Sequence, residues 1–200
     1  MQKSLTTRSG RPASQHPDEL PALIALFKER GVRSYLEIGA RHGDTFYEVM
    51  RSLPPASVGI AVDLPGGLWG VSSSREALDG AISDLRARDY RVGAVYGDST
   101  STVVKEAVLD TASWYGLHGQ FDAILIDGNH RYEGVSADWA IWGEMAPLVA
   151  FHDIAGDGVV QKTSRDPVEV PRLWRELKER HRAVEFVGLN SKMGIGVILL

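Results

Sequence analysis

Apolar residues along this chain follow two spacings, and their alternation predicts a mixed α/β sheet. Apolar positions every three or four residues indicate helices with one buried face, whereas short continuous apolar runs indicate parallel strands buried on both faces. The predicted helices span residues 18–30, 45–53, 75–88, 102–111, 132–145 and 170–180. The predicted strands span residues 34–38, 58–62, 91–96, 121–126, 148–151, 184–187 and 195–200. Strands and helices in this order predict βαβ units around a largely parallel sheet.

The closing strands and the N-terminal segment complete the predicted organisation. Residues 188–194 alone join the last two predicted strands, and this link is too short for the crossover that parallel strands require. We therefore expect an antiparallel hairpin there, and seven strands in total. Residues 1–16 contain three basic residues and no acidic one. This predicts a flexible N-terminal arm ahead of a single domain over residues 17–200.

Composition and charge narrow the class of protein. The 200 residues include no cysteine, which excludes disulfides, thiolate zinc sites and cysteine nucleophiles. The formal net charge of −4 at pH 7 would repel nucleic acid and anionic lipid, so a small-molecule partner is expected and a nucleic-acid or membrane partner is not. No apolar run has the length of a membrane span, and no secretory signal is visible, so we expect a cytoplasmic protein. The sequence is compatible with a homo-oligomer.

Two of the predicted strands end abruptly in carboxylate and imidazole side chains. The fourth apolar run leads into Asp127 and His130, and the fifth leads into His152 and Asp153. Ligands of open α/β sheets bind at the carboxyl ends of the strands. If the two strands are neighbours, their ends lie about 4.8 Å apart, and the two aspartates could share one cation. Two unpaired carboxylates at that distance would repel each other, so we expect a metal ion or a raised pKa.

The turn after the first predicted strand contains two glycines, in the sequence Glu37-Ile-Gly39-Ala-Arg-His-Gly43. Glycines at this spacing allow a sharp turn and a close approach of the backbone to a ligand. The turn lacks the middle glycine of the dinucleotide motif, and Asp44 stands where the helix N-terminus would receive an anion. A ligand with an amino group and a ribose is therefore favoured over a phosphate-rich one.

Acidic residues also end the second and third predicted strands. Asp63 is placed where an acid can reach ribose hydroxyls, and Asp98, followed by Ser99, could bond an adenine amino group. Either acid alone could equally cap a loop. A purely structural sheet, however, has no need of acids or glycines at the ends of five successive strands. The combination indicates a nucleoside-binding edge.

These motifs together resemble the class I S-adenosylmethionine-dependent methyltransferases over roughly residues 30–200. The resemblance implies a Rossmann-like three-layer sandwich with strand order 3-2-1-4-5-7-6 and an antiparallel strand seven. It places Glu37 and Gly39 by the methionine moiety, Asp63 at the ribose and Asp98 at the adenine. The full set of cofactor-binding residues that it implies is Glu37, Gly39, Gly43, Asp63, Asp98, Ser99 and Asp127.

Within that superfamily, residues 127–138 and 151–153 are similar to metal-dependent small-molecule O-methyltransferases, including enzymes that modify the sugars of macrolide and rhamnosyl natural products. This resemblance implies that Asp127 and Asp153 hold a divalent ion, magnesium or manganese, and that His130 is the catalytic base beside Asp127. His152 stands where those relatives carry an acid. Because imidazole suits softer ions than magnesium, His152 either ligates such an ion or points away from the metal.

The predicted function is methyl transfer from S-adenosylmethionine to a hydroxyl of a small molecule or sugar moiety, assisted by a metal. Two other classes stay open. His130, His152 and one aspartate would suit a non-haem iron oxygenase, and a binding protein could keep the pocket without turnover. Asp138, on a predicted helix, is expected to face solvent. The loop 64–74, with Trp69, is expected either to cover the cofactor or to be a solvated loop.

Overall fold

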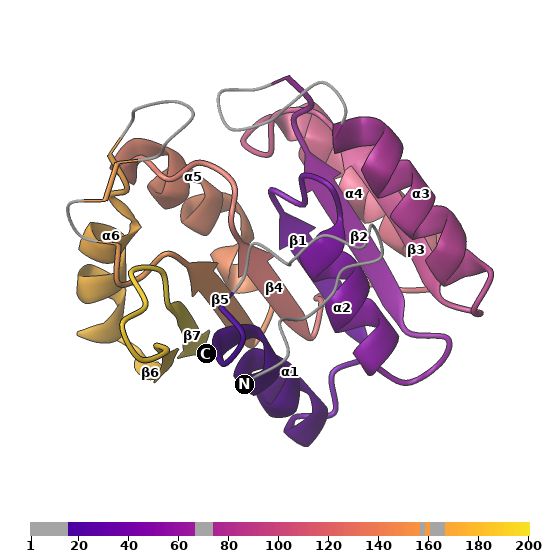
Figure 1. The fold of residues 1–200 in the computed structure, drawn as a ribbon. Helices are drawn as coiled ribbons and strands as arrows, with labels where there is room; N and C mark the ends of the chain where they lie inside the picture. Colours follow the sequence, from indigo (N-terminus) through magenta and orange to yellow (C-terminus); the bar gives the residue numbers. More distant parts are fainter. Residues whose placement is uncertain (1–15, 67–73, 157–158, 161–166) are drawn as a thin grey trace.

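The computed structural model describes residues 16–66, 74–156, 159–160 and 167–200, which build one seven-stranded sheet (Figure 1). The strands are β1 (Ser34–Ile38), β2 (Val58–Asp63), β3 (Arg91–Tyr96), β4 (Ala123–Ile126), β5 (Leu148–His152), β6 (Arg182–Phe186) and β7 (Ile195–Leu199). Their order in the sheet is β3-β2-β1-β4-β5-β7-β6, and β7 runs antiparallel to both of its neighbours. The predicted strand count, order and reversed strand are confirmed.

Helices cover both faces of the sheet, which makes the three layers of a Rossmann-like fold (Figure 1). The helices are α1 (Glu19–Glu29), α2 (Asp44–Ser52), α3 (Ser74–Arg86), α4 (Thr102–Trp114), α5 (Tyr132–Trp142) and α6 (Val170–Lys178), with a 3-10 turn η1 (Gly143–Met145). Apolar side chains of α1 to α3 form one core with one face of the sheet, and those of α4 to α6 form a second core on the other face.

Burial along the strands follows from this sandwich. Every residue of β1, β2, β4 and β5 is buried, because helices cover both faces of these central strands. Neighbouring residues contribute to opposite cores, as Tyr35 and Leu36 of β1 do. The edge strands β3 and β6 are partly exposed. The continuous apolar runs therefore correctly indicate the central strands, whose carboxyl ends form the site.

Several boundaries differ from the predictions. Helix α4 continues to Trp114, because the first helix breaker is Gly116. Helix α5 ends at Trp142 and gives way to η1 instead of running to residue 145. Strand β6 begins at Arg182, which pairs with Leu199, so its register is set by β7 and not by its own weak apolar pattern.

Within the described ranges, no helix combines the length and the apolar character that crossing a bilayer requires. Apart from His16, the predicted N-terminal arm lies outside the described residues. The same holds for Trp69 and most of the loop 64–74. The arm, its boundary with the domain and the covering role of this loop stay predictions.

Candidate active site

The carboxyl ends of the central strands open into one cavity of about 850 Å³. The predicted site residues that line this cavity are Glu37, Gly39, Asp63, Asp98, Ser99, Asp127, His130, His152 and Asp153. Strands β1, β2 and β4 are paired in register, so Ile38 lies beside both Val62 and Ile126. Strands β4 and β5 are also parallel neighbours, with Ile126 beside Phe151, so the residues that follow β4 lie close to those that follow β5. Both predicted halves of the site therefore share one hollow.

The two glycines of the turn after β1 serve close packing. Both have a left-handed backbone, with φ of +88° at Gly39 and +78° at Gly43. A Cβ at Gly39 would overlap the backbone carbonyl of Asp127, and one at Gly43 would lie 2.8 Å from a methyl of Leu78 in α3. Gly39 thus brings the β1 turn against the end of β4. Gly43 does not line the cavity, so a contact with a cofactor there stays a prediction.

Glu37 is a buried acid of the site, 2% exposed. It accepts a hydrogen bond from the Tyr35 hydroxyl at 2.6 Å. Burial raises the pKa of its carboxyl to about 8; the Tyr35 bond opposes this rise, and the nearby Asp127 adds to it. The Glu37 carboxyl is therefore mostly protonated at neutral pH, and a cationic ligand beside it would favour its ionised form.

Asp63 and Asp98 differ in environment. Asp63 is buried and accepts hydrogen bonds from the Arg41 amide at 2.9 Å and the Ser74 hydroxyl at 3.2 Å. Burial raises the pKa of Asp63, although both hydrogen bonds oppose the rise. Asp98 accepts from the amide and the hydroxyl of Thr100, and these bonds lower its pKa. Asp98 is thus a turn acceptor that also reaches the cavity.

Asp138 was missed by the sequence analysis. The expectation that it faces solvent is wrong, because Asp138 is 1% exposed and lines the cavity. It accepts a hydrogen bond from the Ser99 hydroxyl at 2.6 Å, and burial raises its pKa to about 6. The spacing of apolar residues in the sequence does indicate its burial. Asp138 lies three residues after Val135 and four before Trp142, which are both buried, so it shares their helix face.

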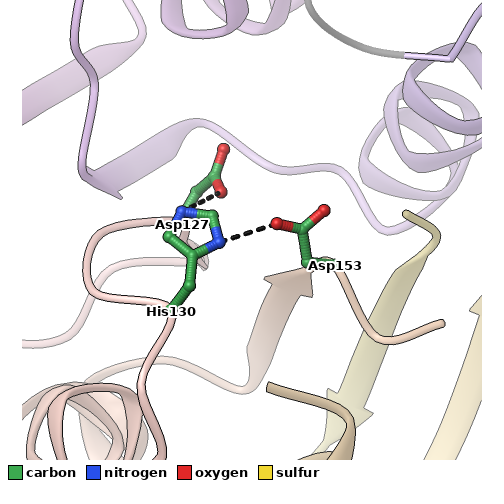
Figure 2. A group of neighbouring side chains, drawn as sticks. All are labelled: Asp127, His130 and Asp153. Carbon is green, nitrogen blue, oxygen red and sulfur yellow. Dashed lines mark ion pairs between the residues drawn. The ribbon is translucent and has the colours of Figure 1, made fainter. Parts of the chain in front are cut away.

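The other end of the cavity holds a cluster of carboxylates and imidazoles. Figure 2 shows His130 with ion pairs to Asp127 and Asp153. Its Nδ1 lies 2.6 Å from Asp153 Oδ2, and its Nε2 lies 3.9 Å from Asp127 Oδ1. The Nδ1 of His152 lies 3.1 Å from Asp153 Oδ1 and 3.4 Å from Asp127 Oδ1. Both imidazoles therefore contact both aspartates.

The charges within this cluster compensate one another. Burial lowers the pKa of His152, but the two aspartates outweigh this effect and raise the pKa well above its usual value. Burial likewise raises the pKa of Asp153, yet hydrogen bonds from the two imidazoles bring it well below its usual range. The predicted repulsion between two aspartates is thus relieved by histidines. The backbone of Asp153 is left-handed, with φ of +62°, a strained conformation for a residue other than glycine.

The cluster also fits a divalent ion. One ligand atom each from Asp127, His130 and Asp153 lies within 4.8 Å of the others. Carboxylate oxygens are the ligands that magnesium prefers, and an imidazole beside them is acceptable to manganese, so these side chains could hold such an ion. His152 is not part of this group, and its buried Nε2 has no hydrogen-bond partner among the described residues. Whether His152 ligates a metal stays a prediction.

A sequence model of the methyltransferase domain matches residues 36–154, more than half of the chain. The chain belongs to the methyltransferase domain family. The matched segment begins in β1 and ends just after β5, so it contains every cofactor and metal residue predicted for this methyltransferase. The resemblance stated from the sequence motifs is confirmed.

Solved structures share the fold of this methyltransferase. The O-methyltransferase TomG from Streptomyces achromogenes, solved in complex with SAM, is 17% identical with a TM-score of 0.67, over 96% of this chain and 83% of that chain. An O-methyltransferase from Bacillus cereus, in complex with SAH, is 19% identical with a TM-score of 0.65, over 94% of this chain and 84% of that chain. A search among curated protein sequences finds no match.

Proposed function

We propose that this methyltransferase transfers the methyl group of S-adenosylmethionine to a hydroxyl oxygen of a small molecule or sugar moiety, with a magnesium or manganese ion held by Asp127 and Asp153. One observation carries the proposal. A single cavity has Asp63 and Glu37 on one side and the cluster of Asp127, His130 and Asp153 on the other. A nucleoside-bearing donor and an acceptor hydroxyl can therefore meet inside it.

The side of the cavity at the carboxyl ends of β1 and β2 suits the methyl donor. The Asp63 carboxylate can accept hydrogen bonds from ribose hydroxyls, because its present donors leave acceptor capacity on both oxygens. The acids Glu37 and Asp127 suit the positive sulfonium and ammonium groups of the donor. The close packing at Gly39 keeps the two strand ends adjacent, so these charges converge. The complexes of the two solved relatives with SAM and SAH support this assignment.

The side of the cavity at the carboxyl ends of β4 and β5 suits deprotonation of an alcohol. The donor supplies an electrophilic methyl on sulfur, and a divalent ion beside the acceptor oxygen would lower the pKa of that oxygen. His130 takes the acceptor proton while the oxygen–carbon bond forms and the carbon–sulfur bond breaks. Asp153 holds Nδ1 of His130 at 2.6 Å, which orients the ring and leaves Nε2 as the proton acceptor. General base catalysis of this kind typically contributes about 10²–10⁴-fold.

We assign His152 a positioning role. Its Nδ1 is within hydrogen-bond distance of both Asp127 and Asp153, so it can hold the two carboxylates in place as they face an ion. The iron oxygenase alternative would need both His130 and His152 on one ion. The group that the geometry brings together contains two carboxylates and only one imidazole, which does not match the two-histidine, one-carboxylate set of such oxygenases.

Transfer of a labelled methyl group from S-adenosylmethionine to a panel of hydroxylated small molecules tests the proposal. We expect the variant His130→Gln to lower kcat by at least about 100-fold, because the base is lost, while affinity for S-adenosylhomocysteine is unchanged. We expect a chelator to abolish turnover, and magnesium or manganese to restore it. His118→Gln, an exposed histidine after α4, is the matched control. Full activity after chelation would reject the ion, and full activity of His130→Gln would reject the base.

A further inference from the structure

Beside Asp153, the cavity wall includes two loop segments that the proposed chemistry does not use. One follows β5 and contributes valines, and the other joins β6 to β7. The residues that these segments place on the wall are Val159, Val160, Val168, Lys192 and Met193. The wall at this end is therefore apolar, with one amine.

Hydrogen bonds hold the backbone around Lys192 beside the segment that follows Asp153. Two residues after Asp153, the Ala155 amide donates to the carbonyl of Met193 at 2.7 Å. On the other side of the loop, the carboxylate of Glu19 accepts the amides of Gly188 and Gly194 at 2.9 Å and 3.2 Å. The backbone that carries Lys192 is therefore held from two sides, and its side chain has a defined starting point at the cavity rim.

Lys192 differs from the other basic residues of the cavity outside the cluster of aspartates and histidines. Arg41 and His42 lie in the turn after β1, where both act electrostatically on Asp63, so they belong to the donor side. Within the described parts of the chain, no carboxylate lies within ion-pair distance of the Lys192 amine. The lysine is exposed and reaches a cavity whose ionisable lining is otherwise mostly acidic. A cation in this place is suited to an anionic group that arrives with the acceptor.

We infer that Lys192 is a specificity-determining residue that binds a carboxylate on the acceptor, whose apolar body lies against Val159, Val168 and Met193. The inference rests on the proposed function, because it describes the acceptor of that same site. A single lysine matches a group with a single negative charge. A phosphate dianion would bring a larger desolvation cost to the same apolar wall.

A matched pair of acceptor probes tests the inference: dihydroxyphenylacetate and its uncharged methyl ester, each titrated into the methyltransferase with S-adenosylhomocysteine bound. We expect Lys192→Met, which keeps most of the length of the unbranched side chain and removes its charge, to weaken binding of the acid about fivefold and to leave the ester unchanged. Lys192→Arg should retain the preference for the acid. In turnover, we expect Lys192→Met to raise KM for the acid about fivefold at constant kcat.

Three other outcomes would overturn the inference. Equal loss of acid and ester binding in Lys192→Met would mean that the lysine only balances the acidic cavity. Failure of both probes to bind the wild-type protein at millimolar concentration, while S-adenosylhomocysteine binds, would also overturn the inference, and in that case the proposed function stands. If S-adenosylhomocysteine itself fails to bind, the proposed function fails and the inference falls with it.

Discussion

At the scale of single residues, the acids of this cavity differ in charge state because their neighbours differ. Burial raises the pKa of Glu37 to about 8, whereas two hydrogen bonds from Thr100 lower the pKa of Asp98. Asp153 keeps its charge because two imidazoles bind it. Without ligand, the site therefore holds one deeply buried acid in its neutral form. A cationic donor at Glu37 would compensate the charge that this acid gains on ionisation.

This difference predicts a pH effect on stability. The unfolded chain releases the Glu37 proton near pH 4.5, whereas the folded protein holds it to about pH 8. Rising pH therefore removes stability across this window. We expect the free energy of unfolding of the ligand-free wild type, relative to Glu37→Gln, to fall by on the order of 1 kcal/mol per pH unit between these limits. Urea unfolding at several pH values measures it.

The control for this pH effect is Glu106→Gln, an exposed glutamate of α4. Its pH profile should follow that of the wild type. A constant difference between wild type and Glu37→Gln from pH 5 to pH 8 would contradict the assignment.

Site residues could be predicted from the sequence where local pattern decides their position. Asp63 is the last residue of a buried strand, and Asp127 and Asp153 directly follow buried strands, so the direction of the strands places all three at one edge of the sheet. Asp138 could not be placed with the same ease, because its buried carboxylate accepts a hydrogen bond from Ser99, which is 39 residues away in the chain. A helix pattern shows which face a residue is on, but not that a hydroxyl from another loop will satisfy a buried carboxylate.

At the scale of elements, one buried glutamate of α1 connects this helix to the loop between β6 and β7. Glu19 is 1% exposed, and its carboxylate accepts two amides of that loop, at Gly188 and Gly194. These contacts join residues that are 169 and 175 positions apart in the sequence. The helix itself was predicted from its apolar spacing, but nothing local in the sequence indicates this connection.

We expect Glu19→Ala to lower the free energy of unfolding by about 2–3 kcal/mol, because it removes two charge-assisted hydrogen bonds and leaves amides without their acceptor. The matched control is Glu29→Ala, an exposed glutamate at the other end of the same helix, which should cost less than about 0.5 kcal/mol. Urea unfolding of both variants measures the difference. Equal stability of the two would show that the loop is held without Glu19.

At the scale of the whole molecule, the sheet order brings the donor and acceptor sides together. The sheet extends from β3 at one edge to β6 at the other, and β1 and β4 are paired near its middle, so their carboxyl ends lie side by side. The antiparallel β7 beside β5 brings the loop with Lys192 to the acceptor side. Strand count and the closing hairpin followed from the apolar pattern. The order of the strands came from the resemblance of the motifs, because pairing between distant segments is not encoded in local spacing.

Calorimetric titration with S-adenosylhomocysteine tests the central claim that one cavity has a donor side at Asp63 and a reacting side at Asp153. We expect micromolar binding to the wild type and at least tenfold weaker binding to Asp63→Asn, because a carboxylate that accepts ribose hydroxyls is lost. Asp153→Asn should bind within about threefold of the wild type. Absence of binding to the wild type, or wild-type affinity in Asp63→Asn, would contradict the account.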